Sequence, residues 1–348
     1  MTETMKIVFS PQHRRHHPRR EFTARADALL PHPERPERAD RILAALEERG
    51  AGQVLPPNPI PEDILTSVHD PGLIAFLQNI APAWSERLGR ERPAVSEVFA
   101  LRPSPRPPRP PGELFHQVGY YCFDVQTPVL PGTYAAALES ARCALTAADL
   151  LLAGESRIYS LCRPPGHHAG RDYYGGYCYF NNAALAAVRL SAAGRPAILD
   201  LDFHHGNGTQ DIFYSSPEVL YVSLHADPNV SYPYFSGYED ERGEGPGEGA
   251  NRNICLPRGC GNARYLNGLE AAQGEIAAFR PDFLVVSLGV DPQEGDPVGD
   301  LGITDAGFTA VGRKLAELGL PLLLVQEGGY ALDSLAGAVT SVFEGLAG

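Results

Sequence analysis

Along this chain, short runs that are apolar almost throughout alternate with longer segments in which apolar residues repeat at helical spacing. The runs predict parallel strands buried on both faces, at residues 5–9, 158–162, 197–203, 219–225, 283–290 and 322–326. The segments predict helices at residues 36–48, 65–77, 133–152, 182–193, 265–279 and 306–318. This alternation predicts an α/β protein with a doubly wound, mostly parallel sheet.

Side chains capable of chemistry stand where four of these strands end. They are His167 and His168 after 158–162, Asp200, Asp202 and His204 at the end of 197–203, Asp291 after 283–290, and Tyr330 after 322–326. In open α/β sheets, ligands bind outside the carboxyl ends of the strands. We therefore expect these side chains to lie together at one edge of the sheet.

Their residue types suit metal-assisted hydrolysis. In an extended strand Asp200, Asp202 and His204 share one face, with neighbours about 6.6 Å apart, so that two of them could bind one ion. Carboxylate oxygens and an imidazole nitrogen suit zinc, and Asp291 as a third ligand leaves a position open for water and substrate. The alternative for Asp202 and His204 is a hydrogen-bonded pair at a strand end.

The other side chains at this edge offer proton transfer and oxyanion stabilisation. Two adjacent histidines, His167 and His168, supply imidazoles that exchange protons near neutral pH. The phenol of Tyr330 can donate to a developing oxyanion. Taken singly, a His-His pair or a Gly-Gly-Tyr turn is more often structural, so the hypothesis depends on their occurrence together.

Composition narrows the class of protein. The chain has 348 residues, and we expect one large domain, with the Pro/Arg-rich segment at 93–111 as a loop inside it. The basic run HRRHHPRR (13–20) is either a solvated loop or one that lines a site or an oligomer interface. A formal net charge of −13 argues against general nucleic-acid binding and favours cationic partners.

Targeting signals and disulfides are not expected. The beginning of the sequence lacks the pattern of a signal peptide, and no apolar run approaches the length of a membrane span. We therefore expect a cytoplasmic protein without membrane association. The six cysteines show no CxxC spacing, which predicts buried thiols and not a disulfide framework.

Five motifs carry a resemblance to a known family: RPPGHHAG (163–170), GGYCYFNNAA (175–184), ILDLDFHHGNGTQDIFY (198–214), VSLGVD (286–291) and QEGGY (326–330). The chain resembles the histone deacetylase superfamily of zinc amidohydrolases, specifically its bacterial acetylpolyamine amidohydrolase branch. HPERPER (32–38), VHDP (68–71) and QVGYYC (117–122) add weaker support. The resemblance implies a three-layer arginase/deacetylase-like fold with an eight-stranded parallel sheet. It also implies one catalytic domain over residues 1–348, with loop insertions near 11–35 and 93–116.

The resemblance assigns catalytic roles to particular residues. One catalytic zinc ion, replaceable by Fe²⁺ or Co²⁺, would be held by Asp202, His204 and Asp291. Zinc and His168 would activate a water, Tyr330 would help to polarise the amide carbonyl, and His168, or the pair with His167, would protonate the leaving amine. Asp200 would orient His167. Asn207, where class I deacetylases have an aspartate, would orient His168.

The resemblance also implies a substrate tunnel and a cation site. Tyr177 and Tyr232 match the tunnel walls, and Gly176 offers its carbonyl nearby. Phe115 and His116 stand where polyamine-type members place a glutamate, with Glu113 two residues away. A structural potassium ion would be bound by the side chains of Asp200, Asp202 and Ser223 and the carbonyls of His204 and Leu224. A second monovalent cation would lie near Phe213.

The function implied is zinc-dependent deacetylation of N-acetylated primary amines. The expected substrate is a small cationic acetylated amine, and the expected assembly is a homodimer or higher homo-oligomer. The alternatives are a protein acetyl-lysine deacylase, a hydrolase of another small amide, and a non-catalytic acetyl-binding module. An arginase-type metal hydrolase is a further alternative, but it would need carboxylates for a second metal and would leave Tyr330 without a role.

Overall fold

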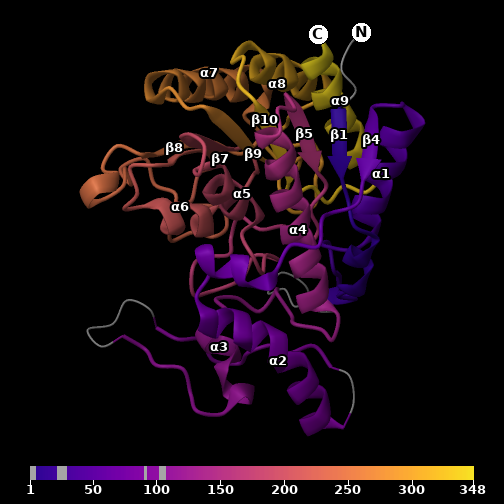
Figure 1. The fold of residues 1–348 in the computed structure, drawn as a ribbon, viewed down its shortest axis with the longest axis vertical. Helices are drawn as coiled ribbons and strands as arrows, with labels where there is room; N and C mark the ends of the chain where they lie inside the picture. Colours follow the sequence, from indigo (N-terminus) through magenta and orange to yellow (C-terminus); the bar gives the residue numbers. More distant parts are fainter. Residues whose placement is uncertain (1–4, 22–29, 90–91, 102–106) are drawn as a thin grey trace.

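The computed structural model describes residues 5–21, 30–89, 92–101 and 107–348. Its centre is one eight-stranded sheet in the order β4-β1-β5-β10-β9-β6-β7-β8, in which every neighbouring pair is parallel (Figure 1). The strands are β1 (Met5–Val8), β4 (Gly52–Leu55), β5 (Arg157–Ser160), β6 (Pro196–Asp200), β7 (Leu220–Ala226), β8 (Asn251–Leu256), β9 (Phe283–Leu288) and β10 (Leu322–Gln326). The predicted parallel α/β fold is confirmed.

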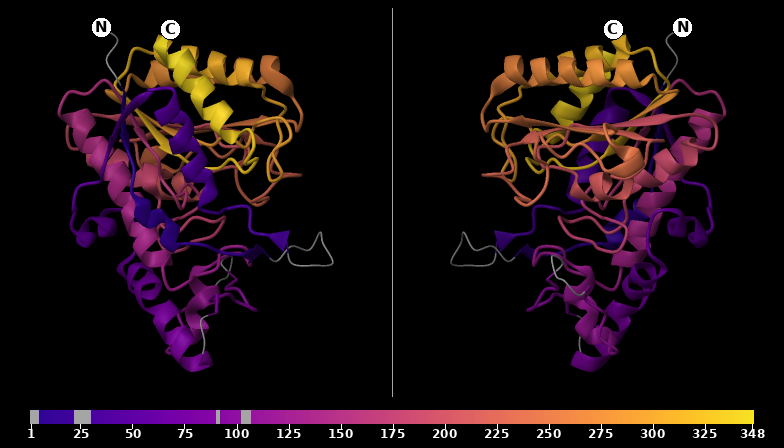
Figure 2. Two further views of the ribbon diagram at one scale, coloured as in Figure 1. Left: turned by 90° about the vertical axis from the view of Figure 1, so that its right-hand side faces the viewer. Right: turned by 90° about the vertical axis from the view of Figure 1, so that its left-hand side faces the viewer.

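Helices cover both faces of the sheet and give three layers. One face is covered by α1 (Glu37–Glu48), α7 (Gly261–Phe279), α8 (Asp305–Glu317) and α9 (Leu335–Ala347). The other is covered by α4 (Thr133–Leu152) and α5 (Asn182–Leu190), with α2 (Pro71–Leu88) in the same apolar cluster. Figure 2 shows the sheet edge-on, with the orange and yellow helices on one side. Successive strand residues alternate between these cores, Ile198 packing into one and Leu199 into the other.

The remaining described elements are short. They are α3 (Val118–Tyr121), α6 (Asn207–Phe213), the 3-10 helices Pro11–Arg15, Glu62–Ser67, Leu114–Gln117 and Gly245–Gly247, and the antiparallel pair β2 (Arg20–Glu21) and β3 (Leu30–Pro31). In the expected insertion at 93–116, the described part is irregular apart from an isolated antiparallel bridge between Ala94 and Val129 and the beginning of the 3-10 helix Leu114–Gln117. Residues 22–29 and 102–106 of the two expected insertions lie outside the described residues.

Several predicted boundaries are wrong by two or more residues, and two of the differences matter most for the site and for α2. The segment at 65–77 is not one helix, because a 3-10 turn ends at Ser67 and α2 begins at Pro71. Asp70 caps α2 by accepting a hydrogen bond from Gly72 N at 2.7 Å, and proline is well tolerated in a first helical turn. The strand predicted at 197–203 ends at Asp200, so Asp202 and His204 lie on the bend after it.

One further finding agrees with the composition. All six cysteines are free thiols and four of them are buried, as predicted. In the described ranges, no helix combines the length and the apolar character that a membrane crossing requires.

Helices α8 and α9 cross so closely that their backbones are in contact at one point. A Cβ added at Gly312 of α8 would lie 2.1 Å from the carbonyl oxygen of Val342 and 2.9 Å from the backbone nitrogen of Leu346, both on α9. These are backbone atoms, which cannot move aside as a flexible side chain would. Glycine at 312 is therefore required by packing. By contrast, Gly274 in α7 has open space where its Cβ would be.

We predict opposite effects of alanine at these two glycines. Gly312→Ala should lower the free energy of unfolding by about 1–3 kcal/mol, because it overpacks the helix crossing. Gly274→Ala should raise it by up to about 1 kcal/mol, because alanine is the better helix former. Urea unfolding of both variants measures the difference. Equal effects would show that α8 and α9 do not pack this closely.

A buried ion cluster joins the segment before α1 to the sheet. The Glu34 carboxylate accepts hydrogen bonds from Arg38 Nη1 and from Arg163 Nη2, each at 3.0 Å, and all three side chains are almost fully buried. Arg38 also donates to the carbonyls of Glu327 and Gly329 in the turn after β10. Burial alone would raise the pKa of Glu34, but the two guanidinium groups outweigh it and lower the pKa to about 2.

We predict that Glu34→Gln lowers the free energy of unfolding by about 3–5 kcal/mol, because it leaves two buried guanidinium groups without their carboxylate. The folded pKa of Glu34 lies below its ordinary value of 4.5, so the contribution is complete above that pH and is lost as the pH falls towards 2. Urea unfolding across this range should show a weaker acid dependence in the variant.

The control for this prediction is Glu344→Gln, which removes one partner of the exposed pair Arg49–Glu344. An exposed pair contributes little, so the change should stay within about 0.5 kcal/mol. Losses of the same size in the two variants would contradict a special role for the buried cluster.

Candidate active site

Four neighbouring strands, β5, β10, β9 and β6, bring the predicted site residues to one edge of the sheet. These residues lie at the ends of the four strands or in the loops that follow them. All of their side chains are buried: His167, His168, Asp200, Asp202, His204, Asp291 and Tyr330. In the structure, as expected from the sequence, these side chains come together at one edge of the sheet.

Asp202, His204 and Asp291 form a compact cluster in which one ligand atom from each lies within 4.8 Å of the others. His204 Nδ1 is 3.1 Å from Asp202 Oδ1 and 3.1 Å from Asp291 Oδ2. This is closer than the spacing of alternate strand residues, because β6 has ended at Asp200 and the chain bends. The same-face argument for Asp202 and His204 was thus wrong in its geometry, although the two side chains do meet.

The cluster fits a divalent cation. Asp291 Oδ1 accepts from Phe203 N at 2.9 Å, and its buried Oδ2 faces only the shared imidazole of His204, at 3.1 Å, among the side-chain partners given for the described residues. Burial and the neighbouring Asp202 carboxylate raise the pKa of Asp291 to about 7. Two buried carboxylates that repel each other, beside an imidazole, form a ligand set that a divalent ion would neutralise.

Two glycines give the cluster its compactness. A Cβ at Gly328 would lie 2.4 Å from Asp291 Oδ2 and 2.5 Å from Asp202 Oδ2, and one at Gly289 would lie 2.1 Å from Asp202 Oδ2. Gly328 N also donates to Asp202 Oδ2 at 2.8 Å. The glycines of the motifs VSLGVD and QEGGY therefore allow the loops after β9 and β10 to approach the carboxylates.

The tandem histidines have opposite electrostatic surroundings. Burial opposes the charged form of His167, but the carboxylates of Asp202 and Asp200 outweigh it and raise its pKa to about 10. His167 Nδ1 lies 3.1 Å from Asp200 Oδ2. For His168, burial and the positive charges of His167 and His204 hold the pKa well below its usual value. His168 Nδ1 lies 2.7 Å from Asn207 Oδ1, so the neutral residue Asn207 is its partner.

Tyr330 is held from several sides. Its backbone N donates to Asp296 Oδ2 at 2.6 Å, and the Arg38 guanidinium lies 4.6 Å from the centre of its ring. Burial raises the pKa of the Tyr330 phenol well above its usual value, which keeps it protonated as a donor. Asp296 and Arg38 were missed by sequence reasoning, because a single aspartate in a loop and an arginine in a helix give no signal of this contact.

Tyr177 and Tyr232 stand beside the catalytic set. The Tyr232 ring is 5.2 Å from that of His168, and the Tyr177 ring is 5.7 Å from that of Tyr330. Each phenol donates to a carboxylate, Tyr232 to Asp124 at 2.8 Å and Tyr177 to Glu21. Gly176 N donates to the same Asp124 oxygen at 2.7 Å. Sequence reasoning missed Glu21 and Asp124, which lie in separate segments without a motif.

Phe115 and His116 are placed elsewhere. The Phe115 ring stacks on Trp84 of α2 at 4.0 Å, and the Arg87 guanidinium lies 4.4 Å from its centre. Glu113 is paired with Arg87 at 3.2 Å and with His116 at 3.6 Å. Between the described residues, no ring contact joins Phe115 or His116 to Tyr177 or Tyr232. The role of these two residues as substrate contacts stays a prediction.

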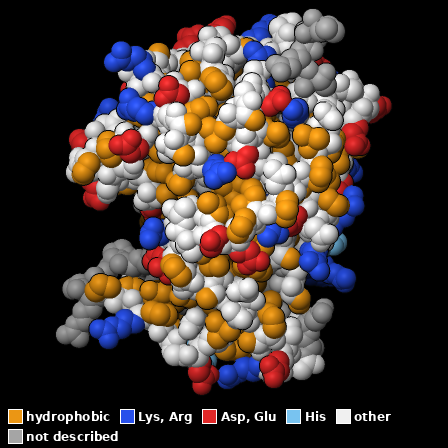
Figure 3. Space-filling view, in the orientation of Figure 1, with side chains coloured by type: hydrophobic (Ala, Val, Ile, Leu, Met, Phe, Trp, Pro, Cys, Tyr) orange, Lys and Arg blue, Asp and Glu red, His pale blue; other side chains and the backbone are white. Residues whose placement is uncertain are grey.

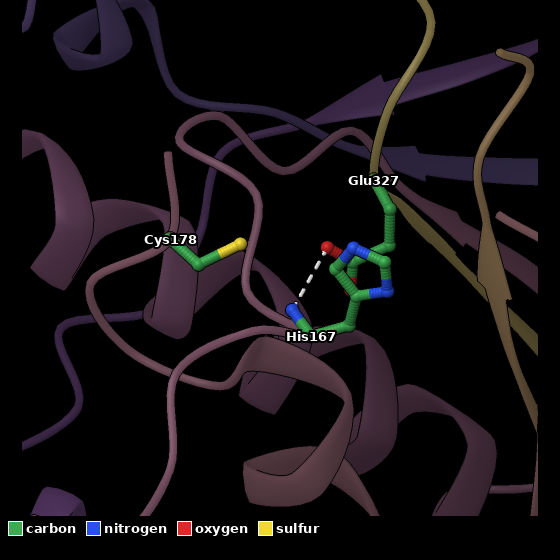
Figure 4. Close-up of side chains that lie close together, drawn as sticks. All are labelled: His167, Cys178 and Glu327. Carbon is green, nitrogen blue, oxygen red and sulfur yellow. Dashed lines mark hydrogen bonds between the residues drawn. The ribbon is translucent and has the colours of Figure 1, made fainter. Parts of the chain in front are cut away.

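A second cluster that could bind a metal, His167, Cys178 and Glu327, lies next to the first. Figure 4 shows the Cys178 sulfur pointing towards His167 and Glu327. Its polar atoms already have protein partners: Glu327 Oε2 accepts from Gly166 N at 2.6 Å and from His167 N at 3.2 Å, and Cys178 Sγ donates to Gly176 O at 3.3 Å. Burial raises the pKa of the Cys178 thiol well above its usual value. The Asp202 cluster is the better metal site.

The residues expected around a potassium ion are also neighbours. Asp200 of β6 is in register with Ser223 of β7, and Leu224 follows it. Asp202 N donates to Asp200 Oδ1 at 3.2 Å, which brings the bend after β6 to the same place. Asp200, Ser223 and the bend at Asp202 are therefore neighbours.

Comparison with known proteins agrees with this site. The sequence-family model of the histone deacetylase domain matches residues 32–346 of the chain. The chain is 42% identical to acetylpolyamine amidohydrolase 1 of Pseudomonas aeruginosa over 99% of both chains, and 42% identical to the acetylpolyamine amidohydrolase of Mycoplana ramosa over 99% of this chain and 100% of that one. A crystal structure of the Burkholderia pseudomallei acetylpolyamine aminohydrolase superposes with a TM-score of 0.90 at 39% identity, covering 98% of both chains. The chain therefore belongs to the histone deacetylase superfamily, in its bacterial acetylpolyamine amidohydrolase branch, and is a deacetylase.

Proposed function

We propose that this deacetylase hydrolyses N-acetylated diamines and polyamines with one zinc ion held by Asp202, His204 and Asp291, in a single catalytic domain over residues 1–348. The observation that carries the proposal is the convergence of two buried carboxylates and an imidazole beside His168 and Tyr330. Zinc would supply a Lewis acid that acidifies water and polarises the amide carbonyl. Two carboxylates and one imidazole would also accept Fe²⁺ or Co²⁺.

The chain's own residues divide the proton transfers. His168 is neutral, and its Nδ1 is engaged with Asn207 Oδ1, so Nε2 has the lone pair that takes a proton from the attacking water. His167 carries a positive charge beside Asp200 and stabilises negative charge that develops on the substrate. The proton on His168 then goes to the leaving amine. The Tyr330 hydroxyl donates to the oxyanion of the tetrahedral intermediate.

A cationic substrate suits the charge around the wall tyrosines. Glu21 and Asp124 place two carboxylates there, and burial raises the pKa of Glu21 because its charge is poorly solvated. An ammonium group nearby would compensate that charge. The formal net charge of −13 favours encounter with polycations. The relatives' names, which specify acetylpolyamines, agree with this substrate class.

We also propose a structural potassium ion bound by Asp200, Asp202, Ser223 and the carbonyls of His204 and Leu224, and a homodimer or higher homo-oligomer. Large apolar side chains exposed on two loops support self-association: Val98, Leu101, Val230 and Phe235. The second monovalent site near Phe213 and the cytoplasmic location stay predictions from the sequence.

We predict that Asp202→Ala and Asp291→Ala each lose zinc and activity together, because either change removes one of three ligands. Metal content by plasma mass spectrometry and turnover of an acetylated diamine measure both. Asp305→Ala, at the exposed beginning of α8, is the control and should keep both. Full activity after exhaustive chelation would overturn the mechanism.

We predict that Tyr330→Phe keeps the metal and the fold but lowers kcat roughly 10²–10³-fold, the usual loss for one oxyanion donor. His168→Ala should be comparably damaging. His167→Ala should be milder if this residue acts mainly through its charge. Turnover per zinc-loaded molecule measures the effect, and a near-normal rate for Tyr330→Phe would mean that the Gly-Gly-Tyr turn is only structural.

We predict that kcat/KM is highest for an acetylated diamine or polyamine. Acetylcadaverine, acetylspermidine and an acetyl-lysine peptide should be compared at two salt concentrations, since salt weakens attraction between the acidic protein and a cation. If kcat/KM for the peptide or for a neutral acetamide is higher by tenfold or more at both salt concentrations, the enzyme is a deacylase with a different natural amide.

A further inference from the structure

Beyond Asn207, the hydrogen bonds of His168 continue through two residues that have been given no role so far. Asn207 Nδ2 donates to the Tyr173 hydroxyl at 3.2 Å, and the Tyr173 hydroxyl donates to Asp211 Oδ2 at 2.5 Å. Together with the contact of 2.7 Å between His168 Nδ1 and Asn207 Oδ1, these bonds form a chain of four side chains. It runs from the catalytic histidine to an exposed carboxylate on the surface.

The chemistry of its last member fixes the direction of this chain. A carboxylate can only accept hydrogen bonds, so the single hydrogen of the Tyr173 hydroxyl is committed to Asp211. The Tyr173 oxygen is then an acceptor, and the group of Asn207 that faces it must be the amide nitrogen. Asn207 therefore turns its carbonyl oxygen towards His168, and His168 Nδ1 must carry the hydrogen. Nε2 is left with the lone pair.

The side-chain amide of asparagine has an oxygen and a nitrogen of nearly the same size, which differ in that one accepts and the other donates hydrogen bonds. A fixed partner is therefore needed to set which of the two faces His168. If the amide of Asn207 were turned over, its nitrogen would face His168 Nδ1 and favour the tautomer with hydrogen on Nε2. In that tautomer Nε2 has no lone pair with which to take a proton from the attacking water. A weaker contact of the Tyr173 hydroxyl, 3.4 Å from the backbone oxygen of Asn207, is longer than its bond to Asp211 and involves no charged group.

Tyr173 is itself well placed to act as a fixed link. Its side chain is only 8% exposed, and a Cβ at Gly170 would lie 2.4 Å from its ring, so the ring packs against the backbone there. Phe123 contacts the ring from another side, with centroids 5.6 Å apart. Asn207 and Asp211 lie one turn apart on α6, which puts both within reach of one hydroxyl.

We propose that Tyr173 and Asp211 are positioning residues that set the amide orientation of Asn207 and, through it, the tautomer of His168 that has hydrogen on Nδ1. The inference rests on the proposed function only in naming His168 as the residue that accepts the water proton. A carboxylate thus orients His168 without contacting it, and the histidine gains a fixed direction without a second buried charge beside it.

The test uses the nitrogen chemical shifts of histidine rings, which distinguish a protonated from an unprotonated nitrogen. They are measured on zinc-loaded enzyme containing ¹⁵N-histidine, with the His168 signals assigned by their loss in His168→Ala. In the unsubstituted enzyme Nδ1 should be protonated and Nε2 not. In Tyr173→Phe and in Asp211→Ala the two tautomers should be mixed. Asp211→Asn keeps an oxygen that can accept and should restore the original shifts.

Kinetics supply the second reading. Tyr173→Phe should lower kcat about 10-fold, with KM and zinc content unchanged, by analogy with the loss of activity when a partner that orients a metal-ligating histidine is removed. Tyr134→Phe is the matched control, because its hydroxyl also donates to a carboxylate, Glu62 Oε2 at 2.6 Å, but far along the chain from α6. It should leave kcat unchanged. Asp211→Asn should keep most of the activity that Asp211→Ala loses.

The two readings must change together. The proposal is wrong if the His168 shifts of Tyr173→Phe equal those of the unsubstituted enzyme, or if kcat falls no further than in Tyr134→Phe. If the packing of Tyr173→Phe is disturbed, Asp211→Ala decides, because Asp211 is exposed and its replacement leaves the Tyr173 side chain itself unchanged. Failure of the proposed function would look different: no acetylated amine would be hydrolysed, whereas the nitrogen shifts, which need no substrate, would still give their answer.

Discussion

The site depends on one constraint, which is that two buried carboxylates, Asp202 and Asp291, converge on one imidazole, that of His204. Their burial and their mutual repulsion would oppose folding unless a cation compensated them, and the raised pKa of Asp291 reflects both, burial first. The parallel sheet creates the constraint, since β6 and β9 are neighbours whose carboxyl ends must meet. Gly289 and Gly328 then permit an approach that any side chain would block.

The surroundings of this cluster separate two adjacent histidines into different roles. His167 faces carboxylates and holds a positive charge, whereas His168 faces a neutral amide and stays uncharged. A base and a positive charge are thus available side by side at neutral pH. A buried pair of opposite charges also holds the turn that carries Tyr330. Arg38, paired with Glu34, donates to two backbone carbonyls of that turn.

The sequence alone predicts the buried strands, whose apolar runs are visible, and the site residues that stand where these strands end. The runs that became β5, β6, β9 and β10 are buried on both faces, so their apolar character is continuous and their ends are visible. The strands β4 and β8 were missed because they form the edges of the sheet, where partly exposed residues interrupt the apolar run. Helix α9 was also missed, although it is apolar along most of its length, and its packing on α8 appears only in the folded chain.

Contacts between distant segments could not be read from the sequence. Glu21 and Asp124 reach the wall tyrosines from segments far apart in the sequence, and Phe115 stacks on Trp84 of α2. The motifs, by contrast, placed the four strand-end sets correctly at one edge, since parallel strands fix that geometry. The roles of the individual residues stay predictions until they are measured.

The most direct test of the account is anomalous X-ray diffraction at the zinc absorption edge, on crystals of the zinc-loaded enzyme. We expect one strong anomalous peak among Asp202, His204 and Asp291, within bonding distance of a carboxylate oxygen from each aspartate and a ring nitrogen of the histidine. A peak among His167, Cys178 and Glu327 instead, or no peak at either cluster in active crystals, would contradict the central claim.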